Sequence, residues 1–341
     1  MKVLLVCERS GGHVFPALVL AKKIRKNTSD IVYFFATSTS FKKIIKTEGF
    51  KVYGKSFRKR NLMLEGFYRF FEAIFLICKI NPKRIIGFGG RDSFFLIVLG
   101  FLFGIDTAIY EPNKKFGKAN KVLYFFVKRV YCGFPQSKNK KIITVGIPLR
   151  DNIVLIDKDI AKTYLRLDKK PVIFCFGGSQ GSSFINSIAI RLLNELDSDF
   201  QLVHITGKRE YFKISQLYNK INKKTVVFDF YPDMQLLYSA ADIVICRAGA
   251  SSLAEISYYQ LPVIFIAHPA ASCHQKSNAA YFVKEKAAFL FLQDKFDFEK
   301  FKTTIKILLE DENYRNKIKN NLKRIKLAVD AEKFYKILYA S

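Results

Sequence analysis

A short apolar segment, a glycine turn and a helical pattern follow one another twice in this chain, about 170 residues apart. The first copy runs from residues 2–7 (KVLLVC) through a glycine turn into a helical pattern over residues 14–26. The second runs from residues 171–176 (PVIFCF) through G-G-S-Q-G into an amphipathic pattern that ends near Leu196. Strand, glycine turn and helix form the opening unit of a doubly wound α/β domain. The repeat therefore predicts two such domains in tandem.

Further apolar segments alternate with helical patterns along the rest of the chain. The expected strands are residues 31–36, 84–88, 107–110, 142–145, 201–205, 225–228, 243–246, 263–266 and 288–291. Strands that are apolar along their whole length are typical of parallel sheets with both faces covered. We expect one domain over residues 1–150, a second over residues 151–325, and a last helix at about residues 326–341 that packs back on the first domain.

Positive charge is concentrated in the first half of the chain. The net charge is +28. Residues 1–150 hold 29 basic and 8 acidic side chains, a net charge of +21, and residues 151–341 hold 28 and 21, a net charge of +7. Such a field favours phosphorylated substrates, an anionic lipid surface or polyanions. A generally basic proteome would explain the total but not this asymmetry.

Several classes of protein are disfavoured by what the sequence lacks. It has no complete G-x-G-x-x-G with a following acidic residue, no phosphate-binding P-loop motif and no H-E-x-x-H. Its six cysteines form no C-x-x-C pair, which disfavours a disulfide or zinc framework. The D-x-D spacings at residues 157–159 and 197–199 lie in polar connections and are interpreted as solvated surface. We therefore expect no cofactor and no metal.

Two features bear on membranes. No basic and apolar leader opens the chain, so export is not expected. The longest apolar run, residues 94–105, is too short to cross a bilayer, so a membrane role would have to be peripheral.

Three glycine turns follow apolar strands, at residues 10–13, 87–90 and 177–181. A glycine turn that opens a helix offers backbone N–H groups and a positive helix end, and so favours an anion. Each turn alone is equally typical of tight packing without a ligand. Three of them in one chain favour a phosphorylated ligand.

Short motifs lie in order along the chain. In the first half these are S-G-G-H-V-F-P-A-L at residues 10–18, Y-E-P-N at residues 110–113 and G-I-P-L-R at residues 146–150. In the second half they are G-G-S-Q-G at residues 177–181, C-R-A-G-A-S-S-L-A-E-I at residues 246–256 and H-Q-K-S-N-A at residues 274–279. Together they resemble the MurG family of glycosyltransferases. The last two motifs are the most specific.

The resemblance implies an α/β architecture of two doubly wound Rossmann-like domains facing a cleft, the GT-B architecture. It further implies transfer of N-acetylglucosamine from UDP-N-acetylglucosamine to the 4-hydroxyl of an undecaprenyl-diphosphate-linked N-acetylmuramyl-pentapeptide. The reaction would invert C1 and need no metal. The protein would act at the cytoplasmic face of the bacterial plasma membrane as a peripheral protein, with no nucleic-acid partner.

Some positions depart from the family pattern, and they lie on the acceptor side. They are Glu8 and Arg9 in place of glycines, Tyr110 and Pro112 in place of the His and Gln of H-E-Q-N, Ile147 in place of the Asn of G-N-P, and residues 91–94 where small residues are usual. The resemblance therefore specifies the donor more closely than the acceptor.

The resemblance assigns donor binding to the second domain. The carboxylate of Glu255 would accept hydrogen bonds from the two ribose hydroxyls. Ser179 would bind a donor phosphate, and the backbone near Tyr231 would contact the uracil edge. Gln275, with Asn278 second, would bind sugar hydroxyls, and His268 would border the sugar. The ribose and diphosphate would be lined by Ala250, Ser251, Ser252, Leu253 and Ala254.

The segment around Glu255 has a second interpretation. Ser252-x-x-Glu255 is also typical of a capping box at the start of a helix that begins at about Ser252.

On the acceptor side His13 is the best candidate base. Imidazole titrates in the range that proton removal from a sugar hydroxyl requires, and a positive helix end keeps it neutral. His13 binding only a phosphate or the backbone is the alternative. Glu111 is a second candidate catalytic group. The expected substrate-binding residues here are Ser10, Gly11, Gly12, Asn113 and Arg150.

Arg150 would meet the charge that develops on the departing UDP. It could equally pack in the interdomain hinge. Arg247 is a second cation of this kind. His204, in an expected strand, is predicted to belong to the core.

Residues 58–83 mix basic side chains with many large apolar ones. At helical spacing one face is aromatic and aliphatic, with basic residues beside it, which is typical of a helix at a membrane interface. A helix packed on the sheet is the ordinary alternative.

Two other functions stay open. One is another enzyme of the same architecture, such as a glycolipid glycosyltransferase or a UDP-sugar epimerase. The other is a non-enzymatic basic protein that binds nucleic acid or membrane. Only the second predicts salt-sensitive binding without affinity for UDP.

Overall fold

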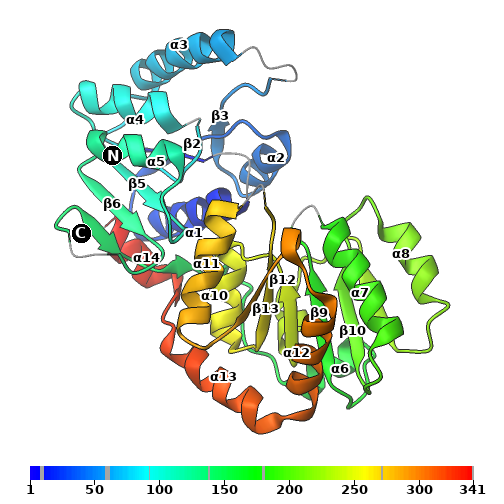
Figure 1. The fold of residues 1–341 in the computed structure, drawn as a ribbon. Coiled ribbons are helices and arrows are strands. Elements are labelled where there is room, and N and C mark those ends of the chain that lie inside the picture. The colour runs from blue at the N-terminus through cyan, green and yellow to red at the C-terminus, as the bar shows by residue number, and fades with distance from the viewer. Residues whose placement is uncertain are drawn as a thin grey trace. The chain divides into compact units, whose positions relative to one another are not determined.

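The structure, a computed structural model, describes residues 1–7, 11–57, 62–91, 93–136, 139–178, 181–269 and 272–339. The chain divides into two compact units (Figure 1). The first unit is Met1–Arg150 with Leu327–Ser341, and the second is Asp151–Lys326.

Seven parallel strands form the main sheet of the first unit, in the order β3-β2-β1-β4-β5-β6-β7 among the residues described. Their bounds are β1 (Lys2–Val6), β2 (Ile31–Phe35), β3 (Lys51–Tyr53), β4 (Arg84–Gly87), β5 (Asp106–Glu111), β6 (Arg129–Cys132) and β7 (Ile142–Thr144). The strands β3 and β6 were not expected from the sequence. The order reverses at β1, which has β2 on one side and β4 on the other.

Helices cover both faces of this sheet because successive side chains of a strand point to opposite faces. Val3 and Leu5 of β1 belong to one buried cluster, and Leu4 and Val6 belong to the other. The first cluster is completed by α1 (Gly11–Asn27), α2 (Thr39–Thr47) and α14 (Ala331–Leu338). The second is completed by α3 (Leu62–Ile80), α4 (Ser93–Leu102), α5 (Lys118–Leu123) and the 3-10 turn η1 (Tyr124–Phe126).

The end of the chain lies in the first unit. β15 (Ala328–Val329) pairs in parallel with β8 (Ile147–Pro148), and Ile147 N donates to Leu327 O at 2.8 Å. The helix expected at about residue 326 begins only at Ala331, because residues 328–329 form this strand and Asp330 caps the helix. The ring of Phe334 in α14 meets Tyr110 of β5 at 5.3 Å.

The second unit repeats the arrangement with six parallel strands, in the order β11-β10-β9-β12-β13-β14. The strands are β9 (Val172–Phe176), β10 (Gln201–Ile205), β11 (Thr225–Phe228), β12 (Ile243–Cys246), β13 (Val263–Ala267) and β14 (Phe289–Leu292). The helices are α6 (Lys158–Tyr164), α7 (Ser183–Glu195), α8 (Tyr211–Tyr218), α9 (Met234–Ala240), α10 (Ala250–Tyr259), α11 (Ser272–Lys284), α12 (Phe298–Glu310) and α13 (Glu312–Arg324), with the 3-10 turn η2 (Gln293–Lys295).

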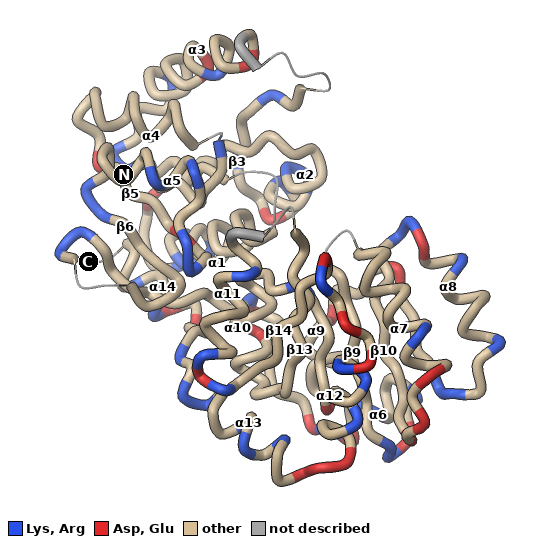
Figure 2. The backbone as a smooth tube through the Cα atoms, viewed as in Figure 1, with Lys and Arg blue, Asp and Glu red and all other residues tan. Residues whose placement is uncertain are grey.

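The strand order of the second unit matches that of the first six strands in the first unit, with β9 in the place of β1. The predicted pair of doubly wound Rossmann-like sheets is confirmed. Charge differs between the two units, as Figure 2 shows: basic segments predominate over the first unit, and basic and acidic segments mix over the second.

Candidate functional site

In doubly wound sheets, ligands bind at the carboxyl ends of the strands where the strand order reverses. In the first unit this point lies between β1 and β4, and the segments that follow these strands contain the first two glycine turns. In the second unit it lies between β9 and β12, followed by residues 177–182 and 247–249. The sequence motifs therefore fall at the expected ligand-binding edge of each sheet.

Two glycines that follow β9, Gly177 and Gly181, leave no room for a side chain. A Cβ on Gly177 would lie 2.3 Å from the backbone N of Ser182, and one on Gly181 would lie 2.2 Å from Thr206 O. Gly181 also has a φ of +76°, which disfavours any residue with a side chain. The turn leads into α7, where Ser182 is the N-cap. Ser179, the predicted phosphate ligand, lies outside the described residues.

The start of α10 tests the capping-box interpretation of Glu255. The helix begins at Ala250 with Gly249 as N-cap, and no side chain caps it. A capping box needs Glu at the third helical position, but Glu255 is the sixth residue of the helix. The predicted start at Ser252 and the capping box are therefore wrong.

Glu255 is instead a buried carboxylate, with 6% of its surface exposed. The hydroxyl of Tyr238 in α9 donates to Glu255 Oε2 at 2.9 Å. Tyr238 is itself buried, and its ring meets Phe174 and Phe176 of β9 at 5.5 and 6.1 Å. A helix-borne carboxylate held by a tyrosine anchored in the core has a fixed orientation, which suits recognition of a diol.

The five residues before Glu255 divide into two groups. Ala250, Leu253 and Ala254 are buried, whereas Ser251 and Ser252 are partly exposed. The side chains of Leu253 and Ala254 therefore belong to the core. The start of α10 can offer two kinds of donor to a diphosphate. These are the N–H groups of its first turn, which have no acceptor within the helix, and the hydroxyls of the two serines.

Arg247 connects the two ligand-edge segments of the second unit. Its guanidinium donates to Ile266 O at 2.9 Å, to Ser182 Oγ at 2.8 Å and to Gln293 Oε1 at 2.5 Å. Burial lowers the pKa of Arg247 to about 10. These contacts favour a structural role for Arg247, which holds the loops in place. They do not favour the predicted role, in which Arg247 contacts the departing phosphate. The sequence shows no signal of the link to Ser182.

Two of the remaining predicted donor residues, Gln275 and Asn278, hold backbone segments in place. Gln275 Oε1 accepts from His268 N at 3.1 Å, so the α11 side chain fixes the end of β13. Asn278 is fully buried and donates to Ala248 O at 3.2 Å, which favours a structural role. Tyr231 lies against Phe228, with ring centroids 4.4 Å apart, and burial raises its pKa. His204 is buried in β10 between Tyr218 and Asn186, as predicted.

In the first unit, His13 is the third residue of α1 and packs against the second glycine turn. A Cβ on Gly89 would lie 3.0 Å from His13 Nε2, and Gly89 has a φ of +96°. Glycine at this position therefore lets the loop after β4 approach the imidazole closely. Gly11 and Gly12 open α1, and Ser10 lies outside the described residues.

Arg150 lies beside the same helix. Its guanidinium carbon is 5.5 Å from the ring centroid of Phe15, two residues beyond His13. A predicted cation is thus placed close to the start of α1 within the first unit.

Glu111 organises the loop after β5. Its Oε1 accepts from the backbone N and the side-chain amide of Asn113 at 3.1 and 2.9 Å. Its Oε2 accepts from Gly117 N at 2.8 Å and from Asn120 Nδ2 at 2.9 Å. The carboxylate is 2% exposed. Four donors occupy it, so its surroundings favour loop positioning over the predicted catalytic role, and the same contacts direct the Asn113 amide to Glu111.

Tyr110, which stands where the resembled family has His, is also structural. It is fully buried and donates to Gly146 O at 2.9 Å.

The helix α3 carries an exposed apolar stripe. Its members recur at helical spacing, and more than half of the surface of each is exposed: Leu64, Phe67, Phe71 and Phe75. Large apolar residues are also exposed at the end of α4 and on the neighbouring turns: Phe101, Leu102, Phe103 and Phe125. Lys79 lies 5.3 Å from the ring of Phe75. Residues 58–61 of the predicted segment lie outside the described residues, and within α3 the predicted aromatic face is exposed.

Within the described part of the chain, no helix has the length and hydrophobicity needed to span a bilayer. The same residues contain no cluster of three or more His, Cys, Asp or Glu side chains arranged to bind a metal ion.

Two domain models match the chain. The glycosyltransferase family 28 N-terminal domain matches residues 4–132, and the family 28 C-terminal domain matches residues 172–332. A protein of Thermoanaerobacter sp. (strain X514) is 32% identical over 363 residues, covering 99% of both chains. It is named UDP-N-acetylglucosamine–N-acetylmuramyl-(pentapeptide) pyrophosphoryl-undecaprenol N-acetylglucosamine transferase. A protein of the same name from Bdellovibrio bacteriovorus is 30% identical and covers 92% of both chains.

Among solved structures, Acinetobacter baumannii MurG has the same fold. It matches with a TM-score of 0.82 at 23% identity, over 100% of this chain and 99% of that chain.

Proposed function

The chain belongs to the MurG family of glycosyltransferases, and from that membership we propose that it transfers N-acetylglucosamine from UDP-N-acetylglucosamine to the 4-hydroxyl of a lipid-linked N-acetylmuramyl-pentapeptide. The second unit binds the donor and the first unit binds the acceptor. The observation that carries the donor assignment is the buried Glu255 carboxylate, fixed by Tyr238 at the helix that follows the ligand edge of β12.

Donor binding uses groups that the fold already holds in place. Glu255 accepts the two ribose hydroxyls, and the first turn of α10 and the turn before α7 offer N–H groups to the diphosphate. Gln275 contacts the sugar, and the backbone near Tyr231 contacts the uracil. Arg247, through Ser182 and Gln293, keeps these segments in register.

The chemical step needs one base and stabilisation of one leaving group. His13 takes the proton of the acceptor 4-hydroxyl while that oxygen attacks C1 of the donor sugar. The bond from C1 to the UDP oxygen breaks with its electron pair, and UDP leaves from the opposite face, so the configuration at C1 inverts. Arg150 is the cation of the first unit assigned to the charge on the departing diphosphate.

The acceptor is carried by a lipid, which gives the exposed stripe of α3 a role. Leu64, Phe67, Phe71 and Phe75 would insert at the interface of an anionic membrane, with the net positive charge of residues 1–150 attracting the lipid headgroups. In this proposal the protein is peripheral, at the cytoplasmic face of the bacterial plasma membrane. The positive field is assigned to lipid and diphosphate, with no nucleic-acid partner.

Calorimetry and a transfer assay test the donor assignment. UDP-N-acetylglucosamine should bind more tightly than UDP-glucose, and transfer should require the lipid-linked muramyl-pentapeptide. Glu255→Gln should weaken UDP binding by about 10- to 100-fold, since hydrogen bonds to a charged group contribute about 1.5–3 kcal/mol. Conversion of UDP-N-acetylglucosamine without any acceptor would favour an epimerase instead. If folded Glu255→Gln bound UDP with wild-type affinity, the assignment of Glu255 to the ribose would be wrong.

Flotation with phosphatidylglycerol vesicles tests the membrane assignment. Combined Phe67→Ser and Phe71→Ser should lower vesicle binding by tenfold or more, since burial of each ring contributes about 1.5–3 kcal/mol. Phe212→Ser is the control, because Phe212 is a phenylalanine on α8 of the second unit that is 74% exposed, against 67% for Phe67 and 52% for Phe71. Equal losses in the two variants would contradict a specific role for α3. Salt-sensitive binding of DNA or RNA at similar affinity would favour the nucleic-acid alternative.

A further inference from the structure

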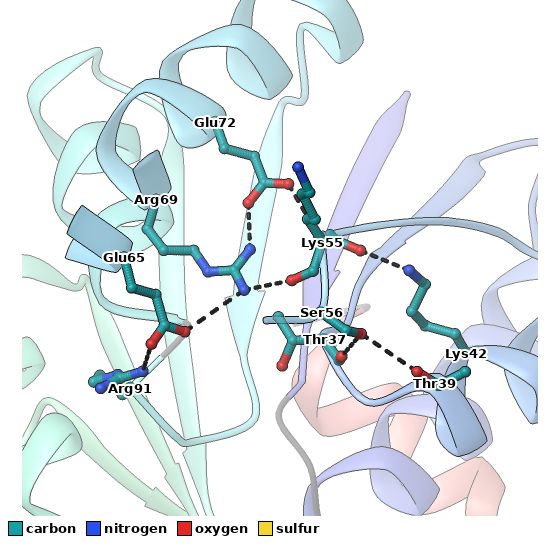
Figure 3. A network of polar contacts seen from close by, with 10 residues as sticks. Thr37, Thr39, Lys42, Lys55, Ser56, Glu65, Arg69, Glu72 and Arg91 are labelled. Carbon is teal, nitrogen blue, oxygen red and sulfur yellow. Dashed lines mark hydrogen bonds and ion pairs between the residues drawn. The ribbon is translucent and has the colours of Figure 1, made fainter. Parts of the chain in front are cut away.

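A buried chain of alternating charges joins α3 to two neighbouring segments of the first unit (Figure 3). Glu65 and Arg69, one turn apart on α3, are only 4% and 5% exposed. Arg69 Nη2 lies 3.9 Å from Glu65 Oε1 and donates to Lys55 O at 2.6 Å, and Arg69 Nη1 donates to Glu72. Glu72 accepts in turn from Lys55 N at 3.2 Å. The chain thus ties α3 to the segment that follows β3.

At its other end the chain of charges reaches the second glycine turn. Arg91, which directly follows Gly90, donates from Nη2 to Glu65 Oε2 at 2.8 Å. Arg91 is 45% exposed, so its contact with Glu65 joins a surface loop to a buried carboxylate. Arg91 is also one of the positions that depart from the small residues usual in the family.

The loop that Arg91 ends is the one that packs on His13. Ser93 Oγ donates towards Gly89 O and Gly90 O, at 2.9 and 3.0 Å, and so holds the loop from its α4 side. Gly89 lies against the His13 imidazole, so closely that a Cβ there would approach Nε2 to 3.0 Å. The loop therefore has two anchors, Ser93 and the Arg91–Glu65 ion pair, and one face against the candidate base.

We propose that Glu65 is a positioning residue for glycosyl transfer: through its ion pair with Arg91, it holds the loop of residues 89–91 against His13 and so fixes the imidazole for proton removal. The proposal rests on the proposed function, in which His13 is the base. A displacement of about 1 Å in a catalytic group can cost on the order of 100-fold in rate, so a loop anchor can matter as much as a direct contact.

The position of Glu65 also connects the loop to the outer surface of α3. Phe67 and Phe71, on the exposed stripe, lie two and six residues beyond Glu65 on the same helix. The opposite side of this helix holds the buried charges. The ion pair therefore joins the proposed membrane helix to the loop at His13.

A double-mutant cycle with His13 tests the proposal. The variants are Glu65→Gln, Arg91→Gln, His13→Gln and the pairwise combinations, with kcat, KM for UDP-N-acetylglucosamine and the calorimetric Kd for UDP as readouts. Glu65→Gln and Arg91→Gln should each lower kcat by tenfold or more, with the Kd for UDP unchanged. The double variant Glu65→Gln/Arg91→Gln should have a kcat no lower than that of the slower single variant. Arg91→Lys should restore part of kcat.

The decisive comparison is in the His13→Gln background. There, Glu65→Gln should have no further effect, because the residue through which it acts is gone. Asp106→Asn is the control for loss of an ion pair in the same unit. Asp106 Oδ2 lies 2.6 Å from Nε of Arg84, which is at the start of β4, whereas this loop follows the end of β4. It should leave kcat unchanged.

Two outcomes would overturn the proposal while leaving the proposed function intact. One is a wild-type kcat in folded Glu65→Gln. The other is an equal fall in residual activity when Glu65→Gln is added to His13→Gln, which would mean an effect independent of His13. If His13→Gln itself keeps full turnover, the base assigned under the proposed function fails, and the positioning of His13 is rejected with it.

Discussion

The hydroxyl of Tyr238 donates a hydrogen bond of 2.9 Å to Oε2 of Glu255, and both side chains are buried. The two residues lie on neighbouring helices, α9 and α10, and Tyr238 is held by the aromatic rings of β9. The core of the second unit thereby fixes the carboxylate assigned to the ribose.

Removing the Tyr238 hydroxyl should therefore weaken nucleotide binding. Tyr238→Phe keeps the packed ring and loses one hydrogen bond, worth about 1 kcal/mol, so the Kd for UDP should rise about fivefold. Calorimetry measures this directly. Tyr259→Phe is the control: Tyr259 stacks on Tyr238, but its hydroxyl donates to Val154 O. Equal changes in the two variants would mean that packing, and not the contact with Glu255, sets the affinity.

Replacing His13 should separate chemistry from binding. His13→Gln keeps a polar side chain but removes the base, so turnover should fall by about 10²–10⁴-fold. The Kd for UDP should stay within twofold, because the donor-binding residues belong to the second unit. Single-turnover kinetics with the lipid-linked acceptor check the rate. Unchanged turnover would assign proton removal to another group.

Glu111 should prove to be a stability residue. In Glu111→Gln, one oxygen that now accepts from two donors becomes an NH₂ group facing them, which should cost about 1–3 kcal/mol of unfolding free energy. Turnover per folded molecule should stay near that of the wild type. Urea unfolding and active-site titration check the two parts.

Glu48→Gln provides the surface comparison for Glu111. Glu48 pairs with Lys22 at 2.9 Å in an exposed position, so its loss should cost at most about 1 kcal/mol. A stable Glu111→Gln protein without turnover would restore Glu111 as a catalytic group.

Acid should destabilise the protein partly through His204. Burial lowers the pKa of His204 from 6.5 to about 3, so the folded state holds the neutral ring while the unfolded state gains a proton below pH 6.5. The stability from this group is complete above pH 6.5 and is lost as the pH falls from 6.5 towards 3, at about 1.4 kcal/mol per pH unit.

The measurement is urea unfolding between pH 7.5 and 5.0 for the wild type and for His204→Gln, which cannot titrate in this range. The variant should be less stable at neutral pH and should lose less stability on acidification. Parallel pH profiles would show that other groups account for the acid sensitivity.

Local pattern was enough to predict most of the framework. Apolar runs at strand length, glycine turns and helical periodicity specify parallel α/β units, because each depends on residues within one element. The same patterns missed β3, which is short and half-exposed, and placed the last helix too early, because β15 exists only through its pairing with β8.

The order of motifs along the chain determined the family, the donor class and the identity of the candidate residues His13, Glu255 and Gln275. Only the tertiary structure shows which groups surround several of the candidate site residues. Glu255 cannot cap α10, because that helix begins at Ala250. Glu111 accepts hydrogen bonds from donors that the fold of the following loop brings together. Glu65 and Arg91 are 26 residues apart in sequence, and no periodicity links them. A sequence pattern reports which face a residue occupies, but hydrogen bonds and ion pairs between distant segments form only when packing brings specific atoms within about 3 Å of one another.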